Sequence, residues 1–174
     1  PGFILDTLCG LTFRISSQSF YQVNATQTEV LYNEAIRLAN LTGAETVIDA
    51  YCGTGTIGLV AARRGAARVI GVDSVPSAIR DAANNARHNG VENAEFVTQD
   101  ATAFMKELEA SEERPQPLVL LMDPPRAGSA PEFLEAATSL APERIVYISC
   151  NPATQARDVR QLVESGYEVR AVRP

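Results

Sequence analysis

Short apolar runs rich in β-branched residues alternate with stretches of helical composition along most of this chain. The alternation is typical of βαβ units, in which helices connect the parallel strands of one sheet. The apolar runs predict six strands, at residues 46–51, 67–73, 94–99, 118–123, 144–149 and 167–172. The stretches between them predict helices at about 56–64, 76–88, 101–110, 131–140 and 153–165. We therefore expect an α/β fold with a mostly parallel sheet and helices on both faces.

The segment before this alternation is predicted to add a strand and a helix. Residues 11–15 (LTFRI) have the composition of a short strand. Thr26 and Glu29 have the spacing of a capping box, which predicts a helix from there to about Leu41. An alternative is a strand-to-helix turn over residues 20–24, with Asn24 as the cap.

Length and composition limit the class of protein. The 174 residues predict one domain, residues 1–174, with a proper hydrophobic core. No apolar run approaches the roughly 18 residues of a membrane span, so we expect a soluble, cytoplasmic protein without a membrane partner. The net charge of −6 argues against this domain gripping nucleic acid by itself. The start at Pro1-Gly2 and the abrupt end at Pro174 indicate a chain cut from something longer.

The three cysteines, Cys9, Cys52 and Cys150, are scattered, without the spacing of a metal site or a disulfide framework. We expect reduced thiols and no bound metal. Burial as a small apolar side chain is the common fate of a free cysteine, and we expect it for Cys9. Cys52 lies within a glycine loop, where it is expected to pack, with a backbone contact to a cofactor as the alternative.

The first strand of the alternating region ends in a glycine-rich loop that opens a helix. Gly53, Gly55 and Gly58 allow a tight turn beneath a ligand at the helix N-terminus. Their spacing also satisfies the dinucleotide fingerprint, so a dehydrogenase that uses NAD is an alternative. Asp49 favours S-adenosylmethionine instead, because its carboxylate would repel a pyrophosphate. It is expected either to orient the loop or to meet the ammonium group of the ligand.

Acidic side chains also follow the next strands, and parallel strands bring their carboxyl ends to one edge of the sheet. Asp73 is placed to accept hydrogen bonds from ribose hydroxyls. Asp100 is placed to accept one from an adenine amino group. The alternative for any single acid is a helix cap. With Asp49 and Asp123 included, four acids at successive strand ends favour a shared ligand site.

Two further motifs bear on the chemistry at this edge. Asp123-Pro-Pro-Arg126 follows the fourth strand of the alternating region, and Ser149-Cys150-Asn151-Pro152 follows the fifth. Enzymes that methylate base amino groups usually have an aromatic residue after Asp-Pro-Pro, so Arg126 favours a carbon target. Carbon 5 of uracil becomes nucleophilic after a thiolate attacks carbon 6. Cys150 is expected to be that thiolate, because a helix N-terminus lowers a thiol pKa. Its alternative is a buried structural thiol.

Taken together, the motifs resemble the RNA uracil-5-methyltransferase family, whose bacterial members act on ribosomal RNA and tRNA. The motifs are Phe20-Tyr-Gln-Val-Asn24, Asp49-x-Tyr-Cys-Gly-x-Gly, Gly-Val-Asp73-x-Val-Pro, Asp-Pro-Pro-Arg126 and Ser-Cys-Asn-Pro-Ala-Thr154. The resemblance implies a Rossmann-like class I methyltransferase fold, S-adenosylmethionine as cofactor and RNA as substrate. It implies Cys150 as the nucleophile and a cofactor site that contains Gln22, Tyr51, Gly53, Gly55, Asp73, Asp100 and Asp123.

The chain also departs from the family pattern. Family members have a glutamate base after a Pro-His-Thr segment, and no candidate for that base occurs in these 174 residues. An upstream RNA-binding β-barrel and a last strand of the sheet are likewise expected outside the chain. Two alternatives stay open. The domain methylates another nucleobase position, or it is a cofactor-binding module without activity in this fragment.

Overall fold

The computed structural model describes residues 3–16 and 24–174. Seven strands are assigned there, namely β1 Phe3–Leu8, β2 Leu11–Ser16, β3 Thr46–Ala50, β4 Arg68–Asp73, β5 Ala94–Thr98, β6 Leu118–Met122 and β7 Arg144–Tyr147. Six helices are assigned, namely α1 Ala25–Ala39, α2 Thr56–Arg63, α3 Pro76–His88, α4 Ala101–Ala110, α5 Pro131–Ser139 and α6 Pro152–Glu164. No helix among these residues is long and apolar enough to cross a membrane.

The main sheet has five parallel strands in the order β5-β4-β3-β6-β7. The chain builds outward from β3 through β4 to β5, and then returns to place β6 on the other side of β3. The strand order therefore reverses between β3 and β6. In open α/β sheets, ligands bind beyond the carboxyl ends of the strands at such a reversal. The predicted α/β fold is confirmed.

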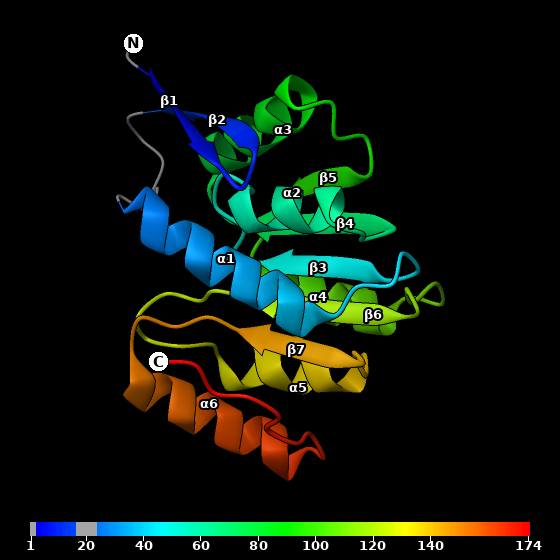
Figure 1. The fold of residues 1–174 in the computed structure, drawn as a ribbon. Coiled ribbons are helices and arrows are strands. Elements are labelled where there is room, and N and C mark those ends of the chain that lie inside the picture. The colour runs from blue at the N-terminus through cyan, green and yellow to red at the C-terminus, as the bar shows by residue number, and fades with distance from the viewer. Residues whose placement is uncertain (1–2, 17–23) are drawn as a thin grey trace.

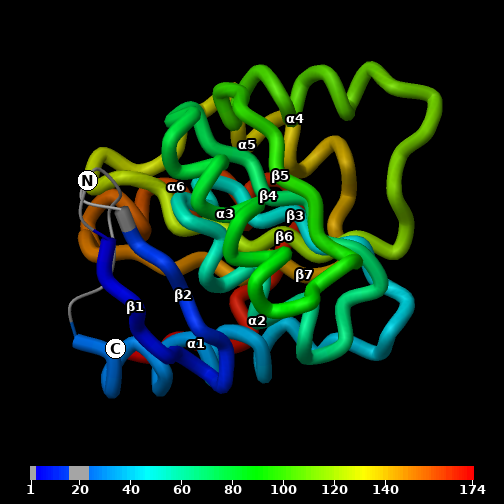
Figure 2. Tube along the Cα trace, turned by 90° about the horizontal axis from the view of Figure 1, so that it is seen from above, coloured from blue at the N-terminus to red at the C-terminus, as the bar shows by residue number. Residues whose placement is uncertain are grey.

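Helices cover both faces of the sheet because alternate strand residues point to opposite faces. Val47 of β3 packs in one core with α1, α2 and α3, whereas the next residue, Ile48, packs in a second core with α4, α5 and α6. Figure 2 shows α1 and α2 on one side of the strands and α4 and α5 on the other. The two cores hold the five strands as a rigid middle layer (Figure 1).

A small hairpin precedes the main sheet, and its first strand was not predicted. The antiparallel strands β1 and β2 meet at Cys9-Gly10, where both φ angles are positive, at 52° and 79°. Two central residues with positive φ fit the right-handed twist of a hairpin. Backbone amides of β2 donate to side chains at the C-terminal end of α3, from Thr12 to the C-cap Asn89 at 2.9 Å and from Arg14 to Asn85 at 2.8 Å. The hairpin is thereby fixed to α3.

The cap of α1 differs from the predicted capping box. Asn24 is the N-cap, and its side-chain oxygen accepts from the Gln27 amide at 3.2 Å. Glu29 accepts instead from the Cys9 amide of the hairpin turn, at 2.7 Å. The capping-box prediction was wrong because Glu29 stabilises a contact with the hairpin, which local spacing does not reveal.

The predicted strand at residues 167–172 is also absent from the described structure. After α6 the Tyr167 amide donates to the Leu162 carbonyl, and the Tyr167 hydroxyl donates to the Pro142 carbonyl at 2.8 Å. Val169 and Val172 are exposed. A strand needs a neighbour for its backbone hydrogen bonds, and this segment pairs with no strand among the described residues. Six strands were predicted from residue 46 onward, and five are formed.

Candidate active site

Acidic side chains gather at the carboxyl ends of β3, β4 and β6, next to the strand reversal. The register explains this placement, because Ala50 of β3 lies opposite Val72 of β4 and Met122 of β6. Asp73 and Asp123 each follow directly on those partners. The strand-end acids therefore share one edge of the sheet, as predicted from the sequence.

Asp49 is the buried acid of this group, with 1% of its surface exposed. Its Oδ2 accepts a hydrogen bond from the Gly58 amide in the first turn of α2, at 2.9 Å. A Cβ atom on Gly58 would lie 2.6 Å from the same oxygen, so the close approach requires glycine. Burial raises the pKa of Asp49 to about 8. Of the two roles expected for Asp49, this geometry fits orientation of the glycine loop.

The glycines of the loop do two different things. Gly53 has φ of 54°, and a Cβ built on it would meet nothing within 4 Å, so the turn is open above its backbone. Gly55 has φ of 77° and lies against Phe96 and Ala82, where a Cβ would clash at 2.7 to 2.9 Å. The left-handed conformation favours glycine at both positions. Gly53 leaves space for a ligand, whereas Gly55 allows the loop to pack on the protein.

Asp73 is fixed at the end of β4 by two backbone amides. Its Oδ2 accepts from the Gly53 amide and its Oδ1 from the Val75 amide, both at 2.9 Å. A carboxylate has about four lone-pair sites, so acceptor capacity remains on both oxygens. A fixed carboxylate with free acceptor sites, next to an open glycine turn, has the chemistry needed to bind two ribose hydroxyls.

Asp100 and Asp123 have different surroundings. Asp100 is exposed and caps α4, where its side chain accepts from the Ala103 amide at 3.0 Å. The cap that the sequence offered as an alternative is therefore present, and it leaves a second oxygen for another partner. Asp123 is half-buried and accepts no hydrogen bond from the residues that the structure describes. Its burial raises the pKa of the carboxyl to about 6.

Tyr51 connects the carboxyl end of β3 to α5. Its backbone has φ of 64°, which turns the chain sharply after β3. The ring lies 5.3 Å from the ring of Phe133 on α5, centroid to centroid. The hydroxyl donates to Ser129 Oγ over 3.4 Å, a long hydrogen bond. The remaining predicted cofactor residue, Gln22, lies outside the described residues.

Cys150 lies between β7 and α6 and is exposed, whereas Cys52 is buried and Cys9 is intermediate. Asn151 caps α6 by accepting from the Ala153 amide at 3.1 Å, and Pro152 lies in the first turn. This confirms the predicted position of Cys150 just before a helix that Pro152 opens. The alternative of a buried structural thiol is excluded by its exposure.

The loop after Asp123 is bound to the start of α6. The carbonyl oxygen of Arg126 accepts from Asn151 Nδ2 at 3.1 Å and from Thr154 Oγ1 at 3.2 Å. Both donors belong to the motif that contains Cys150. The Asp-Pro-Pro-Arg and Ser-Cys-Asn-Pro motifs, which are separate in the sequence, therefore form one bonded structure beside the strand reversal.

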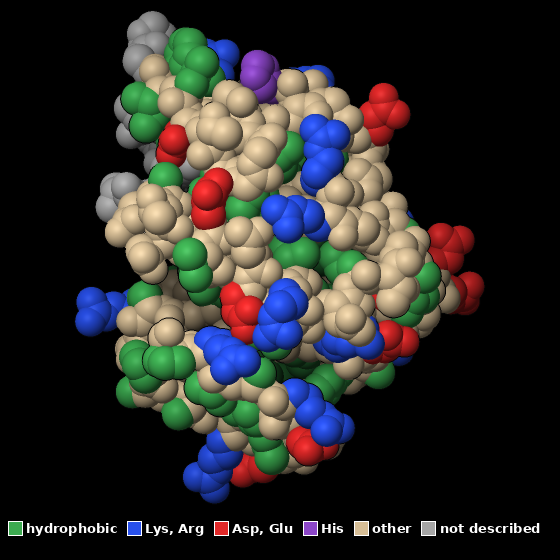
Figure 3. All heavy atoms as spheres, viewed as in Figure 1, with side chains coloured by type: hydrophobic (Ala, Val, Ile, Leu, Met, Phe, Trp, Pro, Cys, Tyr) green, Lys and Arg blue, Asp and Glu red, His purple; other side chains and the backbone are tan. Residues whose placement is uncertain are grey.

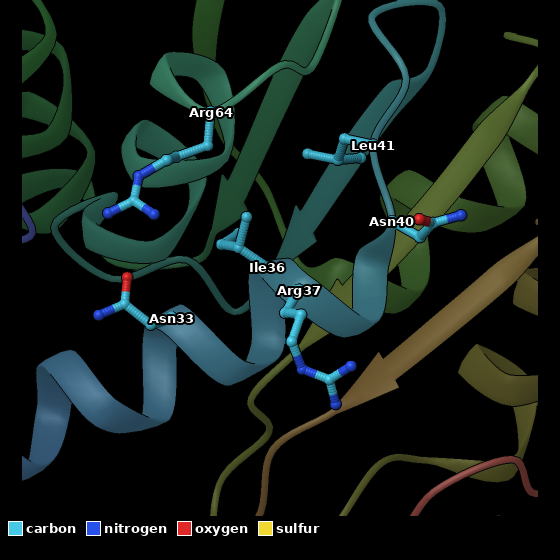
Figure 4. Close-up of a pocket in the computed structure, with 6 residues that line it drawn as sticks. All are labelled: Asn33, Ile36, Arg37, Asn40, Leu41 and Arg64. Carbon is cyan, nitrogen blue, oxygen red and sulfur yellow. The ribbon is translucent and has the colours of Figure 1, made fainter.

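A cavity of about 300 Å³ lies elsewhere, between α1 and the end of α2. It is lined by Asn33, Ile36, Arg37, Asn40, Leu41 and Arg64, and Figure 4 shows Asn33 and Arg64 extending toward one another. Basic side chains on this face lie among acidic ones (Figure 3). Glu34, for example, pairs with both Arg37 and Arg173. This face is therefore not a uniformly basic surface.

The family model described as "Methyltransferase domain" matches residues 41–165. The chain belongs to the methyltransferase domain family. The match spans the glycine loop, all four strand-end acids and Cys150. The family implies S-adenosylmethionine as the methyl donor, which confirms the predicted cofactor. The fixed Asp73 carboxylate and the open turn at Gly53 fit its adenosine moiety.

Relatives of this methyltransferase domain are longer proteins. It is 50% identical over 172 residues to an uncharacterized RNA methyltransferase of Halalkalibacterium halodurans, covering 99% of this chain and 37% of the relative. It is 52% identical over 166 residues to an uncharacterized RNA methyltransferase of Lactiplantibacillus plantarum, covering 95% of this chain and 36% of the relative. The chain thus spans little more than a third of the length of these relatives.

Solved structures share the fold. The tRNA (uracil-54, C5)-methyltransferase of Pyrococcus abyssi, in complex with S-adenosyl-L-homocysteine, matches with a TM-score of 0.78 and 36% identity. That match covers 92% of this chain and 38% of the Pyrococcus chain. A SAM-dependent methyltransferase from Agrobacterium tumefaciens matches with a TM-score of 0.74 and 22% identity over 94% of this chain and 57% of the other, a likeness of fold alone.

Proposed function

We propose that this domain methylates carbon 5 of uridine in RNA, with Cys150 as the covalent nucleophile. The observation that carries the proposal is the exposed thiol at the N-terminus of α6, in the loop bonded to the segment after Asp123. Relatives at 50% and 52% identity are described as RNA methyltransferases, and the Pyrococcus neighbour as a tRNA uracil-C5 methyltransferase. These names support RNA as the substrate class.

We propose the following roles for the cofactor residues. Asp73 accepts from the two ribose hydroxyls, and Asp100 accepts from the adenine amino group. The backbone around Gly53 lines the ligand, and Tyr51 and Asp123 complete the site toward the methyl group. Gln22, which the family resemblance implies as a further cofactor residue, lies outside the described residues.

The proposed reaction has three steps. The Cys150 thiolate forms a bond to carbon 6, which moves electron density to carbon 5. Carbon 5 then takes the methyl group from the sulfonium of the cofactor, and S-adenosylhomocysteine is released. Finally a base removes the proton from carbon 5, so that the bond between carbon 6 and sulfur breaks and the thiolate leaves. The family resemblance implies a glutamate outside these residues as that base.

The test is covalent trapping in the full-length protein. RNA that contains 5-fluorouridine cannot lose a proton from carbon 5, so the adduct should accumulate as a stable protein–RNA complex when S-adenosylmethionine is present. Cys150→Ala should abolish the complex. Cys9→Ala, a change of the cysteine in the turn between β1 and β2, should leave it intact. Equal trapping by wild type and Cys150→Ala, or none by either, would contradict the proposal.

A further inference from the structure

A buried carboxylate lies within α6, the helix that begins after Cys150, outside the group of strand-end acids. Asp158 lies in the second turn of α6 with 1% of its surface exposed. Its Oδ2 accepts from the Ser129 amide at 2.8 Å and from the Tyr147 hydroxyl at 2.7 Å. Its Oδ1 accepts from Arg157 Nε at 2.9 Å and from an Arg157 terminal nitrogen at 2.7 Å. Four donors thus converge on one carboxylate.

The partners of Asp158 come from the segments on either side of the candidate site. Tyr147 is the last residue of β7, and the chain reaches Cys150 three residues later. Ser129 belongs to the loop after β6, and its hydroxyl also accepts the long hydrogen bond from Tyr51 at the end of β3. Through Tyr51, Ser129, Tyr147 and Arg157, the Asp158 network joins three strand ends to α6.

The loop after Asp-Pro-Pro-Arg lies directly against this network. Arg157 donates to the carbonyl of Ala127 at 3.0 Å and to that of Ser129 at 3.3 Å. Gly128 has φ of 81°, and a Cβ on it would lie 2.5 Å from Arg157 and 2.7 Å from Asp158. The backbone of this loop therefore reaches the carboxylate with no room for a side chain.

A buried carboxylate is costly unless its partners compensate for the water it loses. Here every partner is a hydrogen-bond donor. Replacing any of the four donors by an apolar group would take a hydrogen bond away from the buried carboxylate. Residues of the network also lie on both sides of Cys150 in the sequence. Tyr147 holds the chain just before Cys150, and Asp158 holds the helix that begins just after it.

We infer that Asp158 is a positioning residue, which sets Cys150 against the cofactor-side loops through its four hydrogen bonds. The inference rests on the proposed function, because it assigns Asp158 to the attack of Cys150 on carbon 6. Covalent attack depends steeply on placement, and a misplacement of about 1 Å can cost about 100-fold in rate. Loss of the Asp158 carboxylate would release both the end of β7, which precedes Cys150, and α6, which follows it.

Asp158→Asn in the full-length protein tests the inference. An asparagine keeps the size of the side chain, but its NH2 group faces a donor whichever way it is turned. We expect the rate of adduct formation with 5-fluorouridine RNA to fall by about 10- to 100-fold. The dissociation constant for S-adenosylhomocysteine, measured by calorimetry, should change by less than about threefold, because no described hydrogen bond of Asp158 goes to a proposed cofactor residue.

Glu45→Gln is the matched control. Glu45 is also a buried carboxylate, with 2% exposed, and it accepts from the Thr42 amide and hydroxyl at 2.9 and 2.8 Å. It lies before β3, at the opposite end of the strands from Cys150. Glu45→Gln should lower the melting temperature without slowing adduct formation in the folded protein. A purely structural role for Asp158 would make the two variants behave alike.

Tyr147→Phe keeps the test decisive if Asp158→Asn fails to fold. It removes one donor to Asp158 and nothing else, and it should slow adduct formation by about 3- to 10-fold with unchanged cofactor affinity. Unchanged adduct rates in the folded variants, or adduct rate and cofactor affinity falling together, would overturn the inference. Failure of the wild type to form any adduct would instead count against the proposed function.

Discussion

At the scale of single residues, burial separates side chains that look alike in the sequence. Asp49 and Asp100 both lie near the carboxyl ends of strands, yet Asp49 is almost fully buried and Asp100 is exposed. Burial in a medium of low polarity disfavours the charged carboxylate, which raises the pKa of Asp49 to about 8. The sequence predicts where such acids stand along the chain. It does not predict which of them the fold removes from water.

The raised pKa of Asp49 predicts that stability falls as the pH rises. The unfolded pKa is about 3.9, and the folded value is above it, so the stabilisation is present at low pH and is lost as the pH rises through about 8. The expected slope in the free energy of unfolding is about −1.4 kcal/mol per pH unit near pH 6 and about half of that near pH 8. Asp49→Asn, which keeps an acceptor for the Gly58 amide, should flatten this slope in denaturant titrations.

Asp100→Asn is the control for that experiment. Asparagine caps a helix about as well as aspartate, and Asp100 is exposed. Between pH 6 and 8, the free energy of unfolding of Asp100→Asn should change with pH as steeply as that of the wild type. A slope in Asp49→Asn as steep as that of the wild type would show that Asp49 does not carry the effect.

Asp123 predicts a second pH dependence, in cofactor binding. Its pKa is raised to about 6 by burial, so the carboxylate loses its charge as the pH falls below that value. S-adenosylmethionine carries a net positive charge, and an ionised Asp123 beside it would favour binding. We expect affinity measured by calorimetry to rise from pH 5 to pH 7, by at most about tenfold per unit. Asp123→Asn should bind more weakly at pH 7 and lose the dependence; a profile unchanged by the substitution contradicts this role.

At the scale of helices and strands, the alternating pattern predicts the five strands of the main sheet because buried parallel strands are continuously apolar. The failures have different causes. The run at 167–172 has strand composition but no neighbouring strand among the described residues. The strand β1 exposes Phe3, Ile4 and Leu5, so it lacks the pattern of a strand with one buried face.

The cap of α1 gives a test at this scale. Asn24→Ala removes the side-chain acceptor for the Gln27 amide and should lower the free energy of unfolding by about 1 kcal/mol. Thr26→Ala, at the position predicted from the capping box, should change it by less than about 0.5 kcal/mol. Urea titrations of the two variants distinguish the caps. A larger loss for Thr26→Ala than for Asn24→Ala would contradict the observed cap.

The candidate site is predictable in part for the same reasons. Strand ends of a parallel sheet meet at one edge, so Asp73 and Asp123 could be placed together from the sequence. The Asp158 network could not, because Ser129 and Asp158 are 29 residues apart and only the fold brings them together. No motif signals Tyr147 or Ser129, since a buried hydrogen bond between distant residues leaves no spacing pattern.

At the scale of the whole molecule, topology places the proposed nucleophile and the cofactor site at one edge of a rigid sheet. The arginines described on the α1 face lie among acids, and the chain carries a net charge of −6. RNA binding normally needs clustered positive charge to neutralise phosphates. The residues of this domain therefore account better for the proposed chemistry at carbon 5 than for the proposed binding of RNA.

The most direct measurement is the identity of the methylated nucleoside. Full-length protein is incubated with unmodified RNA from a strain that lacks it and with methyl-labelled S-adenosylmethionine, and the RNA is digested and analysed by mass spectrometry. We expect label in 5-methyluridine with the wild type and none with Cys150→Ala. Label in another nucleoside, or in 5-methyluridine at the wild-type level with Cys150→Ala, would contradict it.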